Sequence, residues 1–118
     1  MTAVVIDERI KRFALKQTRG ISYREAGSGP ALVLLHGIGS SSASWLFQLE
    51  GLSRRCRVIA WDAPGYGDSD FLPQKEPEPK HYADALHGLV ERLLLKDVAL
   101  IGNSLGCLMA GEIGRAHV

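Results

Sequence analysis

Residues 98–106 read Val-Ala-Leu-Ile-Gly-Asn-Ser-Leu-Gly, and this stretch decides the fold. An apolar run enters a Gly-x-Ser-x-Gly pentapeptide, which predicts a strand that turns sharply into a helix with a serine at the apex. The turn strains the backbone of its central residue, and the crowded positions on either side of it favour glycine, here Gly102 and Gly106. We therefore expect Ser104 to lie exposed at the carboxyl edge of a sheet, where its hydroxyl can attack a carbonyl carbon.

Two upstream segments also combine a strand with a turn. The apolar run 31–35 leads into residues 36–39, His-Gly-Ile-Gly, a turn of the kind that supplies a backbone N–H to an oxyanion hole. Another apolar run, 58–61, leads into residues 62–69, Asp-Ala-Pro-Gly-Tyr-Gly-Asp-Ser. A lone Gly-x-Ser-x-Gly is a weak signal, but three motifs in this order, each after a strand, are a strong one. From about Ile21 onward the chain resembles the amino-terminal half of the α/β-hydrolase family.

This resemblance implies a function and a set of site residues. Ser104 would be the nucleophile that forms an acyl-enzyme, and the backbone amides of Ile38 and Leu105 would form the oxyanion hole. The implied substrate is a small molecule with an ester, thioester, lactone or ketone-adjacent carbon–carbon bond, as in the family's esterases, enol-lactonases and carbon–carbon hydrolases. Members that open epoxides or cut carbon–halogen bonds carry aspartate at the apex, so a serine there disfavours those reactions. No metal and no cofactor is implied.

The general base is missing from the sequence. In this family the nucleophile is followed by a carboxylate and then a histidine on later strands. Fourteen residues follow Ser104, and among them only Glu112 and His117 are of these types. A helix rises about 1.5 Å per residue, so His117 would lie roughly 20 Å from the serine, whereas a base must come within about 3 Å. The alternative to an active hydrolase is therefore a catalytically inactive fragment, or a half that needs a partner chain.

The remaining histidines and two aspartates are candidates that we interpret as structural. His36 ends the strand expected beside the serine strand, and in the family this histidine supports the oxyanion loop rather than abstracting the proton. His81 and His87 fall in a helical stretch, where packing or exposure to solvent explains them. Asp62 and Asp68 belong to a loop, and we expect them to orient that loop rather than to act as acids.

The predicted fold class is α/β, with a mostly parallel sheet flanked by helices and antiparallel strands at its amino-terminal edge. Two strands, 9–17 and 21–25, are expected around a tight turn at 18–20. Three-to-four-residue spacing predicts two helices. Their apolar residues are Trp45, Leu46, Leu49 and Leu52 in the first, and Tyr82, Leu86, Leu89 and Leu93 in the second. Serines 40–42 offer caps for the first helix, and a last helix begins at the serine turn.

Composition gives the remaining expectations. With 14 basic and 13 acidic residues the net charge is +1, which favours neither nucleic acid nor an anionic membrane as a partner. No apolar run reaches the ~20 residues of a membrane span, and the charged amino terminus does not resemble a signal peptide, so we expect a cytoplasmic protein with free cysteines. We expect residues 1–118 to form one domain that lacks the family's lid and its acid and histidine strands. The strand 98–101 would then have an unpaired edge, which favours self-association.

Overall fold

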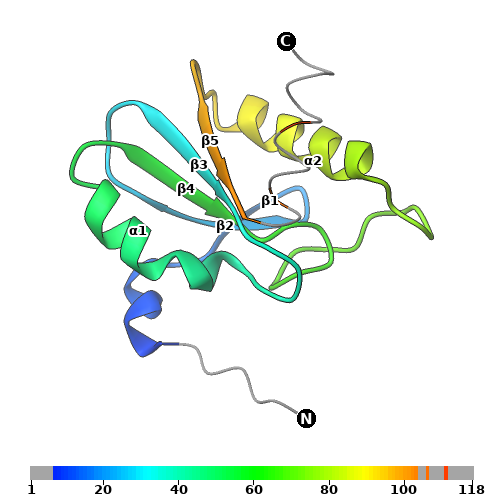
Figure 1. Cartoon of the computed structure of the whole chain (residues 1–118), viewed down its shortest axis with the longest axis horizontal. Helices are drawn as coiled ribbons and strands as arrows, with labels where there is room; N and C mark the ends of the chain where they lie inside the picture. Colours follow the sequence, from blue (N-terminus) through cyan, green and yellow to red (C-terminus); the bar gives the residue numbers. More distant parts are fainter. Residues whose placement is uncertain (1–6, 104–105, 107–110, 112–118) are drawn as a thin grey trace.

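The computed structural model describes residues 7–103, Gly106 and Gly111. Its five strands form one sheet in the order β1-β2-β4-β3-β5 (Figure 1). β3 pairs in parallel with β4 and β5, whereas β2 is antiparallel to β1 and β4. The strands are Lys16–Thr18 (β1), Ile21–Ala26 (β2), Ala31–Leu35 (β3), Arg57–Trp61 (β4) and Ala99–Gly102 (β5). The predicted α/β class, with a parallel core and an antiparallel amino-terminal edge, is confirmed.

Helices cover both faces of the sheet, with α1 on one side and α2 on the other (Figure 1). β3 is apolar on both faces because Leu32 and Leu34 pack on the α1 side, while Val33 and Leu35 pack on the α2 side. The helical segments are Glu8–Arg12 (η1) and Ser42–Trp45 (η2), both 3₁₀ helices, and the α-helices Leu46–Leu52 (α1) and Pro79–Arg92 (α2). The two predicted apolar stripes pack against the sheet: Leu46 and Leu49 are buried on α1, and Leu86 and Leu89 are buried on α2.

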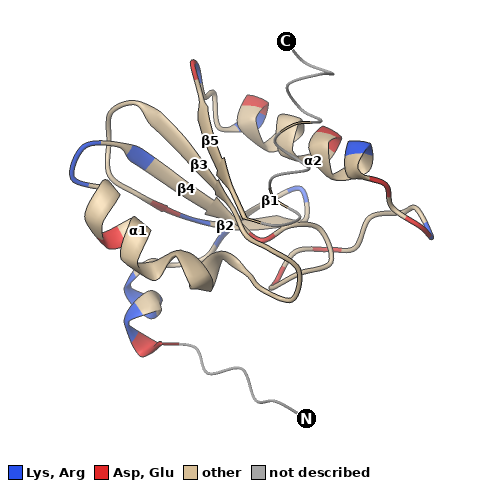
Figure 2. Ribbon diagram, viewed as in Figure 1, with Lys and Arg blue, Asp and Glu red and all other residues tan. Residues whose placement is uncertain are grey.

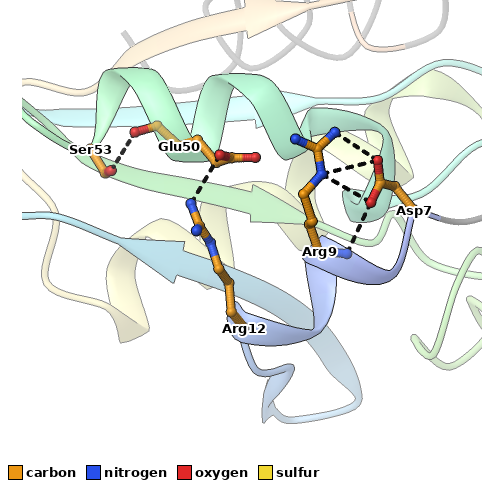
Figure 3. Close-up of polar contacts among 5 residues, drawn as sticks. All are labelled: Asp7, Arg9, Arg12, Glu50 and Ser53. Atoms are coloured by element: carbon orange, nitrogen blue, oxygen red, sulfur yellow. Dashed lines mark hydrogen bonds and ion pairs between the residues drawn. The ribbon is translucent and has the colours of Figure 1, made fainter.

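The predicted strand over residues 9–17 is wrong in most of its length. The segment Glu8–Arg12 is the 3₁₀ helix η1, and only Lys16–Thr18 pairs as a strand. Asp7 begins the helix by accepting a hydrogen bond from the Arg9 N–H at 3.0 Å. The turn places Ile10, 1% exposed, in the core on the α1 side. Arg12 then bonds to Glu50 of α1 at 3.0 Å, so η1 is held against α1 (Figure 3).

Turn chemistry explains the other boundaries. Arg19 and Gly20 have φ values of +46° and +79°, so two consecutive left-handed residues close the hairpin between β1 and β2. Ser41 caps η2, since its hydroxyl oxygen accepts from the Ala43 N–H at 3.3 Å, as the run of serines predicts.

Both charge signs occur along η1 and α2 (Figure 2). No helix in the described ranges is long and apolar enough to span a membrane.

β5 lies at one edge of the described sheet, with β3 on one side and no described strand on the other. Its Ile101 side chain is 44% exposed. We expect the 118-residue chain to self-associate through this edge, because unpaired backbone groups beside apolar side chains accept a further strand. Ile101→Lys should weaken the association by about tenfold or more, since a lysine on an edge strand opposes pairing. Sedimentation over a range of concentrations measures this, and a chain that stays monomeric throughout would contradict it.

Candidate active site

The segment after β5 packs on the end of β3. Asn103 donates its backbone N–H to the Leu35 carbonyl oxygen at 3.0 Å, and Gly106 donates to the Asn103 carbonyl oxygen at 3.0 Å. A Cβ atom at position 106 would lie 2.8 Å from the Leu35 Cβ and would collide with the Leu35 carbonyl oxygen. Only glycine fits there, which confirms the crowding predicted for this position of the pentapeptide. Ser104 and Leu105 themselves lie outside the described residues.

The peptide unit between Gly37 and Ile38 has a fixed orientation. Its carbonyl oxygen accepts two hydrogen bonds, from His36 Nδ1 at 2.8 Å and from the Ser40 N–H at 3.2 Å. A trans peptide is planar, so the Ile38 N–H must point away from this doubly bonded carbonyl. No group among residues 7–103 accepts a hydrogen bond from that N–H, and the Ile38 side chain is 70% exposed. A backbone donor is therefore available immediately after β3.

His36 holds this loop and has both ring nitrogens occupied. It is 1% exposed, and its Nε2 accepts from the Ala63 N–H at 3.0 Å. A carbonyl oxygen can only accept, so the bond to Gly37 requires the proton on Nδ1, and the bond from Ala63 requires Nε2 to carry none, which makes the ring neutral. Burial lowers the pKa of His36 below 6.5, against smaller opposing effects of the Gly37 carbonyl and Asp62. The interpretation of His36 as a structural residue is confirmed, because neither nitrogen is free to take a proton from a serine.

The lowered pKa of His36 makes stability depend on pH. Below about pH 6.5 the unfolded chain binds more protons than the folded chain, so the free energy of unfolding should decrease as the pH falls toward the folded pKa of His36. This residue contributes at most about 1.4 kcal/mol per pH unit, and its contribution is complete above the unfolded pKa. His36→Gln keeps an acceptor for Ala63 but cannot titrate. Urea unfolding between about pH 5 and 8 should show a shallower slope in the variant, and an unchanged slope would refute the assignment.

Asp62 orients its surroundings, as predicted, and is 2% exposed. Its Oδ1 atom accepts from the Ser42 N–H at 2.7 Å, and its Oδ2 atom accepts from the Ser22 hydroxyl at 2.5 Å. Its own carbonyl oxygen accepts from the Ser69 hydroxyl at 2.5 Å. Asp68 is exposed, and its contact with Asp62 is made by its backbone N–H, at 3.4 Å from Asp62 Oδ2. The aspartate was predictable from the sequence, but its partners Ser22, Ser42 and Ser69 were not, because they lie in three separate segments.

The other candidate bases are on α2 or outside the described part of the chain. His81 Nδ1 accepts from the Glu78 N–H at 2.8 Å and so caps α2, while His87 Nε2 lies 3.0 Å from Glu91. Both histidines therefore make local contacts on α2, in place of the packing or exposure to solvent expected for them. Glu112 and His117 are outside the described residues. Within the described residues no three His, Cys, Asp or Glu side chains form a group that could hold a metal ion.

A family comparison agrees with this geometry. The model of the alpha/beta hydrolase family matches residues 32–118, which include the loop after β3, the Asp62 loop and the pentapeptide. The chain belongs to the alpha/beta hydrolase family.

Individual members of the alpha/beta hydrolase family show how much of the fold is matched. The chain is 41% identical over 86 residues to the 2-(acetamidomethylene)succinate hydrolase of Mesorhizobium japonicum, covering 73% of this chain and 31% of that protein. It is 34% identical over 90 residues to the 2-hydroxy-6-oxo-6-phenylhexa-2,4-dienoate hydrolase of Comamonas testosteroni, covering 73% and 32%. The solved structure of an N-acyl homoserine lactonase superimposes with a TM-score of 0.74 at 36% identity, covering 79% and 35%. The chain thus spans about a third of the length of these hydrolases.

Proposed function

We propose that this chain supplies the nucleophile and the oxyanion hole of a small-molecule hydrolase. Ser104 attacks the substrate carbonyl and forms an acyl-enzyme, and the backbone N–H groups of Ile38 and Leu105 stabilise the oxyanion. The observation that carries the proposal is the Ile38 N–H, which is fixed in direction and left without an acceptor among the described residues. The contacts of Asn103 and Gly106 with Leu35 support it, because they hold the chain on both sides of Ser104 and Leu105 at the end of β3.

The proposed reaction is acyl transfer to water. Attack by the serine converts a planar carbonyl into a tetrahedral centre whose oxygen becomes negatively charged, and two fixed N–H donors favour that charge. Each such donor is worth about 10²–10³ in rate. The candidate bonds are an ester, a thioester, a lactone or a carbon–carbon bond beside a ketone. Related proteins named as a lactonase and as a phenylhexadienoate hydrolase support this range without selecting one bond.

The proton acceptor comes from outside these 118 residues in this proposal. His36 has both nitrogens engaged, and His81 and His87 have their own partners on α2. His117 is too far along the predicted helix to reach the serine. The 118-residue chain alone should therefore hydrolyse an activated ester no faster than its Ser104→Ala variant.

A hybrid hydrolase tests the proposal. In it, these 118 residues replace the matching part of the Mesorhizobium japonicum relative and are followed by the remainder of that enzyme, which supplies the acid and histidine. We expect the hybrid to turn over p-nitrophenyl esters, with the parent relative assayed as the control. A soluble hybrid without turnover, beside an active parent, would contradict the proposal.

The second candidate is a catalytically inactive fragment of such a hydrolase, which is favoured by His36, because both of its ring nitrogens are occupied. The two candidates agree on the isolated chain and differ on the hybrid. Serine-dependent turnover by the isolated chain, at rates typical of enzymes, would contradict both.

A further inference from the structure

The loop between β3 and η2 is anchored at both ends to two consecutive residues, Asp62 and Ala63. At its start His36 accepts from the Ala63 N–H at 3.0 Å, and at its end the Ser42 N–H donates to Asp62 at 2.7 Å. Neighbouring Cα atoms are held about 3.8 Å apart by the trans peptide, so the two anchors cannot separate. Residues 37–41 therefore connect two points that the end of β4 fixes.

The Asp62 carboxyl group is itself held firmly by the domain. It is 2% exposed, and the Ser22 hydroxyl of β2 donates to its second oxygen at 2.5 Å. A Cβ atom at Gly67 would lie 2.6 Å from either carboxyl oxygen, so the following loop closes over the group. No Lys, Arg or His in the described part of the chain forms an ion pair with it. Within the described residues, the Asp62 carboxyl group is therefore held by hydrogen bonds. One of these bonds comes from Ser42, at the η2 end of the loop.

We propose that Asp62 is a positioning residue, which holds the Ser42 amide so that the Ile38 N–H stays directed at the substrate oxyanion. The inference rests on the proposed function of this site. The connection runs through Ser40, whose N–H donates to the Gly37 carbonyl at 3.2 Å. That carbonyl belongs to the same planar peptide as the Ile38 N–H, so releasing one lets the other rotate. Asp62 contacts no reacting atom in this account and acts only through the loop.

Two pairs of variants isolate this contact. Asp62→Ala removes the carboxyl group, and Asp68→Ala is its control, because it removes an exposed carboxyl group from the same loop. Ser42→Pro removes the N–H and the hydroxyl, and its ring also places a carbon atom where the N–H pointed at Asp62. Ser42→Ala is its control, because it removes the hydroxyl alone. Proline is well tolerated as the first residue of a helix, which is the place of Ser42 in η2. Ser41 before it is already extended, with φ −164° and ψ −178°, as a residue before proline prefers.

The first measurement is hydrogen exchange by mass spectrometry on the 118-residue chain, which needs no catalytic activity. We expect exchange in residues 38–44 to accelerate by about tenfold or more in Asp62→Ala and Ser42→Pro, because the loop opens locally. The two controls should exchange as the unchanged chain does, and β3 should stay protected in all of them. If Asp62→Ala does not fold, the comparison between Ser42→Pro and Ser42→Ala decides.

The second measurement is kinetic and uses the hybrid hydrolase. Misplacing an oxyanion donor affects the transition state rather than substrate binding, so both variants should lower kcat by about 10²-fold with KM within about threefold. A loop that exchanges normally in both variants would overturn the inference, and so would Ser42→Ala behaving like Ser42→Pro. Absence of turnover in the unchanged hybrid would instead refute the proposed function, and the exchange data would still decide whether Asp62 holds the loop.

Discussion

Replacing Ser104 by alanine in the hybrid hydrolase is expected to lower kcat by at least about 10³-fold. The reason is that, in the proposed reaction, the serine oxygen forms the covalent bond to the substrate. The residual rate should be that of an oxyanion hole acting on water alone. Substrate binding does not require the hydroxyl, so KM should change far less than kcat.

The control for this experiment is Ser28→Ala, an exposed serine in the turn that precedes the amino end of β3. It should keep the full rate of the hybrid. Steady-state kinetics on both variants, with circular dichroism to establish that each is folded, gives the comparison. Equal rates in the two variants would mean that another group performs the attack, and the assignment of the nucleophile would be withdrawn.

Gly106→Ala should have the largest effect on stability, and local helix propensity predicts the wrong sign for it. Alanine is favoured over glycine inside a helix by about 1 kcal/mol. At this position, however, the added Cβ would collide with the Leu35 carbonyl oxygen and lie 2.8 Å from the Leu35 Cβ. Overpacking of this kind typically costs about 1–3 kcal/mol, so we expect a net loss in the free energy of unfolding.

Gly111→Ala is the matched control for that substitution. Gly111 is also helical, but nothing lies within 4 Å of the position its Cβ would take. The same change of residue should therefore leave stability unchanged or raise it by up to about 1 kcal/mol. Urea unfolding of the hybrid hydrolase measures both variants. A Gly106→Ala protein as stable as Gly111→Ala would show that the turn does not pack against β3 as described.

The parallel core was predictable because its local patterns allow one interpretation. β3 is five consecutive apolar residues between a glycine-rich turn and His36, which suits a strand covered on both faces. The pentapeptide was predictable in the same way, because its Gly106 is needed where the chain approaches Leu35 too closely for any side chain. For segments of this kind, the local sequence is enough to predict how they pack in the folded domain.

The segment from Arg9 to Gln17 was mispredicted because its environment is supplied from elsewhere. Its scattered apolar residues suit a strand as well as a turn, and the decision between them comes from the burial of Ile10 and the bond between Arg12 and Glu50. The Asp62 network was only half predictable for the same reason. An aspartate after a strand suggests a role in a loop, but its partners Ser22 and Ser42 lie 40 and 20 residues away in the sequence.

A crystal structure of the hybrid hydrolase treated with a phosphonate ester tests the central claim most directly. The phosphonate traps a nucleophilic serine as a tetrahedral adduct that resembles the transition state. We predict phosphorus bonded to the Ser104 Oγ atom, with one phosphonyl oxygen within about 3 Å of both the Ile38 and the Leu105 backbone nitrogens. An adduct on another residue, or an oxygen directed away from the Ile38 N–H, would contradict the account.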